Sequence, residues 1–332
     1  MMPDHQESKP SRGVSVLIAA FNVENYITEC LESVDNQTAA PDEIIIINDG
    51  STDGTLLRIL EWSSRTSIPS KVITQENRGI TKTRNRLLKM ANYELIAFLD
   101  SDDYWVSNHL EKMKAAFCEN SNIVCCFSDA SAFNDQELTV TSYLNRSNVI
   151  ELEFKEKNSL RILTERITKE LIPGCFIHLN SSIFLRESAV EIGLFDESLP
   201  LSEDRDFFIR LSNYGDWAYY PEVHSFIRQH ESNSTGSKNK LSVLEKSVMV
   251  AKKILASENL LKTHEERKEA KRVLHNSMFN YRYTASKMGL SHYFATGKSH
   301  DSLNKLIWLT DFKSWLRASN ASLSSMNIGR DR

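Results

Sequence analysis

The sequence predicts an α/β protein with a mostly parallel central sheet flanked by helices, followed by an α-helical C-terminal region. Three observations support this fold class. Short apolar runs alternate with segments whose apolar residues recur at helical spacing, which is the pattern of βαβ units. The runs are continuously apolar, as parallel strands buried on both faces tend to be. Beyond about residue 238 only the helical spacing remains.

In the first part of the chain, strands are predicted where short apolar or β-branched runs occur, and helices where apolar residues recur three or four apart. In chain order these are strand 14–20, helix 26–34, strand 43–47, helix 56–60, strand 71–74, helix 80–90, strand 95–99 and helix 109–119. Residues 130–180 carry no clear pattern. A strand over 181–185, a helix over 187–192, a helix containing 203–211 and a strand-like stretch over 217–220 follow.

The C-terminal helical region is basic. Residues 238–332 contain 18 Lys and Arg against 8 Asp and Glu, a net charge of +10, whereas the whole chain has a net charge of −4. We therefore expect three parts: a disordered lead-in at 1–12, an α/β domain at 13–237 and a basic helical region at 238–332.

Composition and cysteine usage favour a cytoplasmic protein. The chain is 41% hydrophobic and 25% charged, which is ordinary for a soluble protein. It has no apolar run near the roughly 18 residues of a membrane-spanning helix, and its first residues do not resemble a signal peptide. The five cysteines show no CxxC spacing, which argues against a disulfide framework and a zinc site.

Three predicted strands end in polar clusters: Ala19-Ala20-Phe21-Asn22, Asn48-Asp49-Gly50 and Asp100-Ser101-Asp102. In an open α/β sheet, ligands bind beyond the carboxyl ends of the strands, so these clusters are expected to meet. Carboxylates this close raise one another's pKa unless a cation compensates, and Mg²⁺ or Mn²⁺ prefers oxygen ligands. We therefore favour a divalent-cation site over helix capping for Asp100 and Asp102, and assign Asp103 to capping or indirect support.

Four segments in this order resemble family-2 glycosyltransferases, whose fold is the Rossmann-like GT-A fold. They are VSVLIAAFNVENYITECLESVDNQT, PDEIIIINDGSTDGT, ENRGITKTRNRLLKMANYELIAFLDSDDYW and GLFDESLPLSEDRDFFIRL, and together with the stretch that follows them they span residues 14 to about 235. One departure is mild: the family often has alanine where Thr83 stands.

The resemblance implies roles for the acidic residues. Asp100-Ser101-Asp102 resembles the family's DxD motif, in which the second aspartate binds the metal that bridges the donor's diphosphate. The first aspartate reaches the ribose or the waters of the metal. Asp204 matches the catalytic base, and Glu203 completes that acidic pair.

Other positions match residues that bind the donor. Asp49 matches the acceptor of a hydrogen bond from the base, and Phe21 lies where an aromatic ring packs on it. Ala19 meets the base through its backbone. Arg84 matches a basic residue near the base or diphosphate, and His230 a position that touches the metal or diphosphate. A purely structural role stays open for four of these residues: stabilising a turn for Asp49, core packing for Phe21, a place on a solvated helix face for Arg84 and an unspecified structural role for His230.

The implied activity is metal-dependent, inverting transfer of a sugar from a nucleotide-sugar donor, with a UDP-sugar favoured, to a saccharide or lipid-linked acceptor in surface polysaccharide biosynthesis. One alternative is a phosphatase of the haloacid-dehalogenase type. However, that motif requires Thr or Val where Tyr104 stands, and it normally opens its domain. The other is a non-catalytic nucleotide-sugar-binding protein, against which the Glu203-Asp204 pair speaks.

The stretch SLNKLIWLTDFKSWLRAS, residues 302–319, mixes aromatic and basic residues at helical spacing. This pattern suits a helix that lies on anionic lipid at the inner face of the cell membrane. It equally suits packing of the aromatic residues against the α/β domain, and both alternatives stay open.

Overall fold

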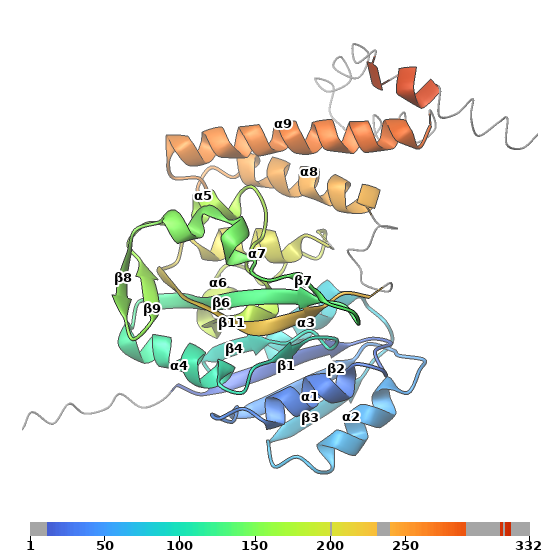
Figure 1. Ribbon diagram of the computed structural model, residues 1–332, viewed down its shortest axis with the longest axis vertical. Helices are drawn as coiled ribbons and strands as arrows, with labels where there is room; N and C mark the ends of the chain where they lie inside the picture. Colours follow the sequence, from blue (N-terminus) through green and yellow to red (C-terminus); the bar gives the residue numbers. More distant parts are fainter. Residues whose placement is uncertain (1–11, 200, 231–239, 290–312, 315, 320–332) are drawn as a thin grey trace, which may run out of the picture. The chain divides into compact units, whose positions relative to one another are not determined.

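The computed structural model describes residues 12–199, 201–230, 240–289, 313–314 and 316–319 (Figure 1). The chain divides into two compact units, Met1–Asn233 and Ser234–Arg332. Of the predicted lead-in at residues 1–12, residues 1–11 lie outside the described residues. So do six apolar residues of the predicted lipid-facing helix: Leu303, Leu306, Ile307, Trp308, Phe312 and Trp315.

The first half of the first unit alternates strands and helices as predicted, apart from the short strand β5, which the sequence did not indicate. Its elements are β1 (Val14–Ala20), α1 (Ile27–Asp35), β2 (Glu43–Asn48), α2 (Thr55–Ser63), β3 (Ser70–Thr74), α3 (Ile80–Met90), β4 (Leu95–Phe98), β5 (Tyr104–Trp105) and α4 (His109–Glu119). The bounds of β1, α3 and α4 are those that the sequence predicts, and β2, β3 and β4 differ from prediction by one residue at one end.

The second half of this unit is richer in strands than the sequence indicates. It contains β6 (Ile123–Phe133), β7 (Leu138–Val140), β8 (Phe154–Lys157), β9 (Leu160–Leu163), α5 (Thr168–Leu171), β10 (Ser182–Leu185), α6 (Arg186–Glu191), α7 (Glu203–Leu211) and β11 (Asp216–Arg228). No pattern in the sequence predicted β6 to β9.

The physical reason is clearest for β6. Polar residues interrupt its apolar run, and each finds a partner inside the protein. Asp129 accepts hydrogen bonds from the backbone N–H groups of Tyr143 and Leu144, both at 3.0 Å, and the Ser131 hydroxyl donates to the carbonyl of Thr141 at 2.7 Å. A strand whose buried polar groups are satisfied by distant residues has no simple sequence signature.

In the described part of the chain, eleven strands form one mixed sheet in the order β3-β2-β1-β4-β10-β6-β11-β9-β8, with β5 paired to β11 and β7 to β6. The predicted parallel pairing holds for β3, β2, β1 and β4. β6, which was not predicted, also runs parallel to β11. β10 runs antiparallel between β4 and β6. The carboxyl ends of β1, β2 and β4 therefore meet at one edge of the sheet.

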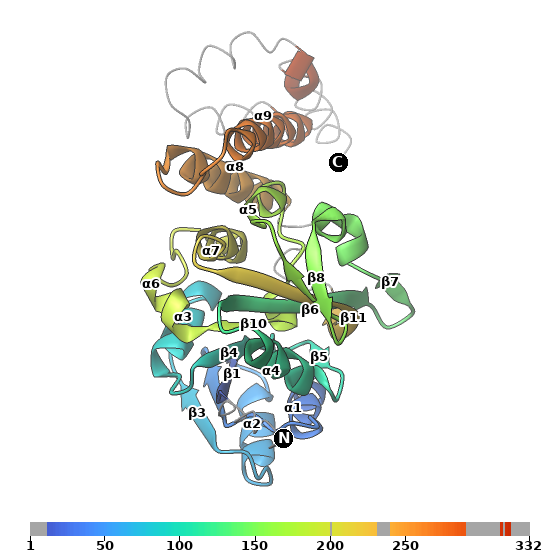
Figure 2. The ribbon, with the colours of Figure 1, turned by 90° about the vertical axis from the view of Figure 1, so that its left-hand side faces the viewer.

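Helices cover both faces of this sheet (Figure 2), with α3, α6 and α7 on one side and α1 on the other. Residues of α1, α2 and α4 share one apolar core with alternate residues of β1, β2 and β4. On the other face, Phe98 of β4 and Phe184 of β10 pack with Phe195 and Phe207, with ring centroids 4.3–6.2 Å apart. This packing fixes α7 against the strands that carry the predicted site.

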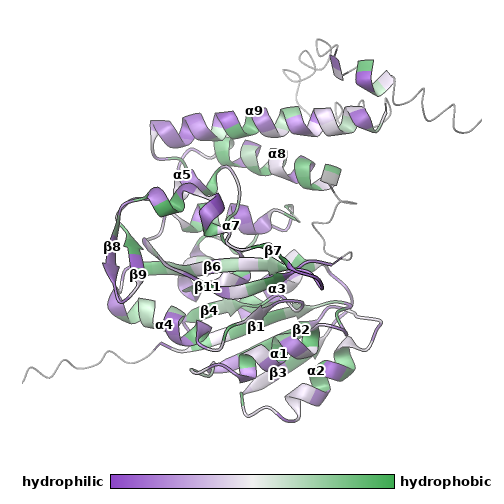
Figure 3. Ribbon diagram, in the orientation of Figure 1, coloured by the Kyte–Doolittle hydropathy of each residue, from purple (hydrophilic) through white to green (hydrophobic). Residues whose placement is uncertain are grey.

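The second unit contains α8 (Lys240–Ala256) and α9 (His264–Lys287). A capping box starts α9: the Thr263 hydroxyl accepts the N–H of Glu266 at 3.1 Å, and the Glu266 carboxylate accepts the N–H of Thr263 at 3.0 Å. Figure 3 shows many hydrophilic residues along α9.

The two helices meet through apolar residues that the sequence places on their faces. Buried Val248, Met278 and Tyr281 form the cluster with half-buried Leu241, Leu244 and Leu274. Met288, the C-cap residue of α9, is 49% exposed. Within the described ranges, no helix combines the length and the apolar character needed to cross a membrane.

Candidate active site

Arg84 of α3 joins two of the predicted acidic groups. Its Nη2 donates to Asp100 Oδ1 at 2.6 Å, and its Nη1 donates to Glu203 Oε1 at 2.8 Å. Burial alone would lower the pKa of Arg84, but the two carboxylates raise it above its ordinary value, so the guanidinium stays charged. The end of β4 and the start of α7 therefore meet at one cation. Because both terminal nitrogens lie on protein carboxylates, the contact of Arg84 with a nucleotide stays a prediction.

Asp102 and His230, the two predicted metal residues, lie side by side. His230 Nε2 is 3.0 Å from Asp102 Oδ2, and the two side chains keep 15% and 20% of their surface exposed. The His230 ring stacks on Tyr26, with centroids 4.6 Å apart. Residues 128 positions apart in the sequence thus reach the same point, because β11 ends beside the acidic turn after β4.

Asp103 ties this turn to two other segments. Its Oδ1 accepts the backbone N–H of Arg228 at 2.7 Å, and its Oδ2 accepts the Nδ2 of Asn180 at 2.5 Å. Burial and then the charges of Asp102 and Asp100 raise the pKa of Asp103 well above its ordinary value. Asp103 does not cap α4, whose N-cap is Asn108. Asp103 therefore does not start a helix, and its two hydrogen bonds hold the acidic turn against Asn180 and Arg228.

The residues present fit a divalent cation that takes few protein ligands. Among the described residues, no group of three or more His, Cys, Asp and Glu side chains is arranged to hold a metal ion. Mg²⁺ and similar ions commonly use only one or two protein carboxylates, with phosphates and water as the other ligands. Burial, and next the charge of Asp100, raises the pKa of Asp102, and a cation beside it would reverse this effect.

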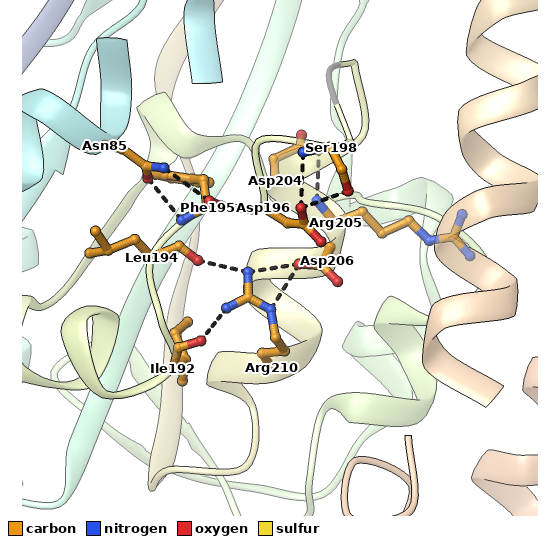
Figure 4. Close-up of polar contacts among 10 residues, drawn as sticks. All are labelled: Asn85, Ile192, Leu194, Phe195, Asp196, Ser198, Asp204, Arg205, Asp206 and Arg210. Atoms are coloured by element: carbon orange, nitrogen blue, oxygen red, sulfur yellow. Dashed lines mark hydrogen bonds and ion pairs between the residues drawn. The ribbon is translucent and has the colours of Figure 1, made fainter. Parts of the chain in front are cut away.

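Asp204, the predicted base, is labelled in Figure 4. It lies in the first turn of α7, directly after Glu203 in the sequence. Its Oδ1 accepts the backbone N–H of Arg205 at 2.7 Å. Burial raises the pKa values of both Asp204 and Glu203, and Arg84 partly offsets this in each. A carboxylate whose pKa is raised toward neutrality is a stronger general base than an exposed one.

The remaining predicted residues lie at the ends of β1 and β2. Phe21 is 47% exposed, so it is not a core residue and its ring is open to a ligand. Ala19 is half-buried in β1 and pairs with Ile47. Asp49 is buried, and it accepts hydrogen bonds from the backbone N–H groups of Arg78 at 2.9 Å and Gly79 at 3.0 Å.

Gln75 Nε2 adds a third donor to the Asp49 carboxylate, at 2.6 Å. The Asp49 side chain therefore orders the loop at residues 75–79, which leads into α3, and does not stabilise the turn in which Asp49 itself lies. A carboxylate has about four acceptor positions, so one remains for a further donor.

Sequence reasoning missed three residues near this site. Arg228 donates from Nε to the carbonyl of Asp102 at 3.2 Å, and Asn85 follows Arg84 on α3. His178 packs its ring against Tyr143, with centroids 4.3 Å apart, and burial lowers the pKa of His178 to about 4. Proximity to the matched motifs was the available signal for Asn85 and Arg228, whereas the sequence around His178 offered none.

Comparison with known proteins matches this arrangement. The family model described as glycosyl transferase family 2 matches residues 15–188. The putative glycosyltransferase EpsH of Bacillus subtilis (strain 168) is 41% identical over 129 residues, which are 39% of this chain and 37% of EpsH. An uncharacterized glycosyltransferase of Haemophilus influenzae is 30% identical over 238 residues, which are 68% of this chain and 72% of that protein.

A third relative carries a more specific name. The Escherichia coli protein WfgD, named UDP-Glc:alpha-D-GlcNAc-diphosphoundecaprenol beta-1,3-glucosyltransferase, is 34% identical over 126 residues, which are 38% of this chain and 48% of WfgD. The chain thus spans less than half the length of both EpsH and WfgD.

Solved structures share the fold. S. aureus TarS 1-349 in complex with UDP-GlcNAc is similar with a TM-score of 0.58 at 22% identity, over 82% of this chain and 73% of that one. The mannosyltransferase PcManGT from Pyrobaculum calidifontis, in complex with GDP-Man and Mn²⁺, is similar with a TM-score of 0.58 at 16% identity, over 92% and 86%. With a GT-A fold, and with the family model matching more than half of its length, the chain belongs to glycosyl transferase family 2.

Proposed function

We propose that the protein is a metal-dependent, inverting glycosyltransferase that moves a sugar from a nucleotide-sugar donor to a saccharide or lipid-linked acceptor in surface polysaccharide biosynthesis. One observation carries the proposal. The buried guanidinium of Arg84 forms ion pairs with both Asp100 of the acidic turn and Glu203 of the acidic pair. The residues proposed to bind the donor and those proposed to include the base are therefore held together by one arginine.

The proposed roles follow from what each side chain can do. Asp102 and His230 would hold a Mn²⁺ or Mg²⁺ ion. When bound, that ion supplies charge stabilisation to the leaving nucleoside diphosphate. Phe21 offers a ring to the base, and Asp49 has an acceptor position left for it. Asp204 takes the proton from the acceptor hydroxyl, and a single base acting in a direct displacement implies inversion at the anomeric carbon.

Names of relatives support the choice of substrates. The name of WfgD gives UDP-Glc as donor and a diphosphoundecaprenol-linked sugar as acceptor, and that of TuaG of Bacillus subtilis gives teichuronic acid biosynthesis. TarS holds UDP-GlcNAc, and PcManGT holds GDP-Man with Mn²⁺. We therefore propose a UDP-sugar donor, and action at the cytoplasmic face of a membrane where lipid-linked acceptors are presented.

Calorimetric titration with UDP, with and without Mn²⁺, tests the donor and metal assignments together. Asp102→Asn is expected to lose the Mn²⁺-dependent part of UDP affinity and to keep the metal-independent part. Asp135→Asn, a change at an exposed aspartate in the β6–β7 turn, is the matched control. Equal Mn²⁺ dependence in Asp102→Asn and the parental protein would remove the metal assignment.

Turnover distinguishes the enzyme from a non-catalytic binding protein. UDP release from a panel of UDP-sugars, with lipid-diphosphate-linked saccharides as acceptors, is expected in the parental protein and lost in Asp204→Asn. Donor binding without release of UDP for any acceptor would instead support the binding protein. The family match leaves no support for the haloacid-dehalogenase alternative.

A further inference from the structure

We propose that Asn85 and Arg210 are positioning residues that hold residues 192–199, here called the entry segment, and thereby keep Glu203 and Asp204 at the start of α7 in place. The entry segment leads from α6 towards α7 (Figure 4). The catalytic consequence rests on the proposed function, whereas the mechanical part does not.

Asn85 forms hydrogen bonds to the middle of the entry segment. Its Oδ1 accepts the backbone N–H of Phe195 at 2.9 Å, and its Nδ2 donates to the backbone carbonyl of Phe195 at 3.0 Å. The same Nδ2 lies 3.0 Å from Glu197 Oε1. Asn85 is buried, so its amide satisfies both backbone polar groups of a buried residue 110 positions away.

Arg210 forms hydrogen bonds to the beginning of the entry segment. From α7, its Nη1 donates to the carbonyl of Ile192 at 2.6 Å, and its Nη2 donates to the carbonyl of Leu194 at 2.8 Å. Its Nε donates to Asp206 Oδ2 at 2.8 Å, which fixes the guanidinium on the helix surface. The planar guanidinium thus binds three acceptors at once, a geometry that lysine cannot reproduce.

The backbone between these contacts has two consecutive residues in the left-handed region. Gly193 and Leu194 have φ angles of +85° and +65°, and the second is unusual for a residue with a branched side chain. Such a conformation persists where surrounding contacts hold it. Besides the two polar contacts, the ring of Phe195 packs on Phe207 of α7, with centroids 4.3 Å apart.

The arrangement connects the entry segment to the proposed base. Arg84 and Asn85 are consecutive on α3, and the first binds Glu203 while the second binds Phe195. Arg210 lies on the same helix as Glu203 and Asp204. The first turn of α7 is therefore held from α3 directly and through the segment that precedes it. A displacement of about 1 Å can cost on the order of a hundredfold in rate, so loosening this hold should be visible in turnover.

Hydrogen exchange measured by mass spectrometry tests the mechanical part on the full chain. Asn85→Ala and Arg210→Lys are each expected to speed exchange about tenfold in peptides covering 192–206, because each loses hydrogen bonds to the entry segment. Peptides of β1 and α4 should be unchanged. Unchanged exchange of 192–206 in both variants would overturn the proposal.

Asn120→Ala is the matched control. The side-chain amide of Asn120 also bridges two segments, since it donates to Asp216 Oδ2 at 2.9 Å and accepts the backbone N–H of Asn122 at 2.8 Å. It lies at the opposite ends of the strands, beside the first residues of β6 and β11. The Asn120→Ala variant should show the same hydrogen exchange in residues 192–206 and the same turnover as the parental protein.

Kinetics test the catalytic part. Each variant is expected to lower kcat about ten- to a hundredfold with an unchanged Kd for UDP, because the groups proposed to bind the donor are not altered. The double variant should lose less than the product of the two single effects, since both act on one segment. Faster exchange with unchanged kcat would overturn the link to the base. A parental protein without turnover would overturn the proposed function, and exchange alone would then decide whether the two side chains hold the segment.

Discussion

Arg84→Met provides a quantitative test of how much the two ion pairs of the Arg84 guanidinium stabilise the protein. The substitution keeps an unbranched side chain of similar length and removes the charge. Glu203 is then left buried without its partner, with a side chain only 5% exposed, whereas Asp100, at 38%, can turn to water. The damage should therefore come mainly from Glu203.

The expected loss in free energy of unfolding is about 3–5 kcal/mol, the usual cost of removing one partner of a buried ion pair. The Asp100 contact adds little because solvent screens it. Since whole domains are stable by about 5–15 kcal/mol, the variant should still fold. Urea unfolding followed by tryptophan fluorescence measures the change, because Trp62, Trp105 and Trp217 are all buried in the first unit.

Two further variants make this result interpretable. Arg84→Met combined with Glu203→Gln should recover part of the loss, because no uncompensated charge remains buried. Arg58→Met removes an exposed ion pair with Glu61, whose side chains are 55% and 50% exposed, and should change stability by less than about 1 kcal/mol. If Arg84→Met were as harmless as Arg58→Met, the buried ion pair would not have the energetic role assigned to it.

Three other predictions concern separate parts of the molecule. Phe21→Ala should weaken UDP binding by about 1–3 kcal/mol in calorimetry without lowering thermal stability, because the ring is exposed and stacking on a base has about that value; equal binding would exclude base contact. The pKa of His178 is lowered from its ordinary value of 6.5 to about 4, so the unfolded chain binds a proton in this window that the folded protein does not. His178 should therefore lower stability as pH drops from 6.5 to 4, by about 1.4 kcal/mol per pH unit, and His178→Gln should remove this contribution from the slope measured in urea titrations. Thr263→Ala removes the capping box of α9 and should lower the stability of the second unit by about 1 kcal/mol, as measured by the thermal loss of helical circular dichroism; no change would contradict the capping role.

Local sequence patterns predicted the first half of the fold well because local physics dominates there. β1 and β2 are buried on both faces, so their sequences are continuously apolar, and α3 and α4 carry apolar residues at helical spacing. For β6, and for β11 beyond the predicted stretch 217–220, the pattern fails, since buried polar residues such as Asp129 and His224 lie within these strands. Their environment is made by segments distant in the sequence.

The candidate site divides in the same way. The acidic cluster after β4 was predicted from residue types at a strand end, whereas the DxD motif and the role of the Glu203-Asp204 pair were implied by the family resemblance. The structure brings these residues to one edge of the sheet. The sequence did not indicate that Arg84 joins them, that Asp103 binds Arg228 and Asn180, or that Asn85 holds Phe195. Each of these contacts connects elements that a local pattern cannot relate.

The amino-acid sequence by itself determined most elements of the first half of the α/β domain and the acidic residues that follow them, because periodicity and strand ends depend on neighbouring residues alone. Only the tertiary structure decided which charges pair. Glu203 lies 119 residues from Arg84, and the antiparallel insertion of β10 between β4 and β6 belongs to the sheet arrangement that brings α7 and α3 to the same face. Hydrogen-bond and ion-pair partners are fixed by distance in space, and that distance is set by the packing of the whole sheet.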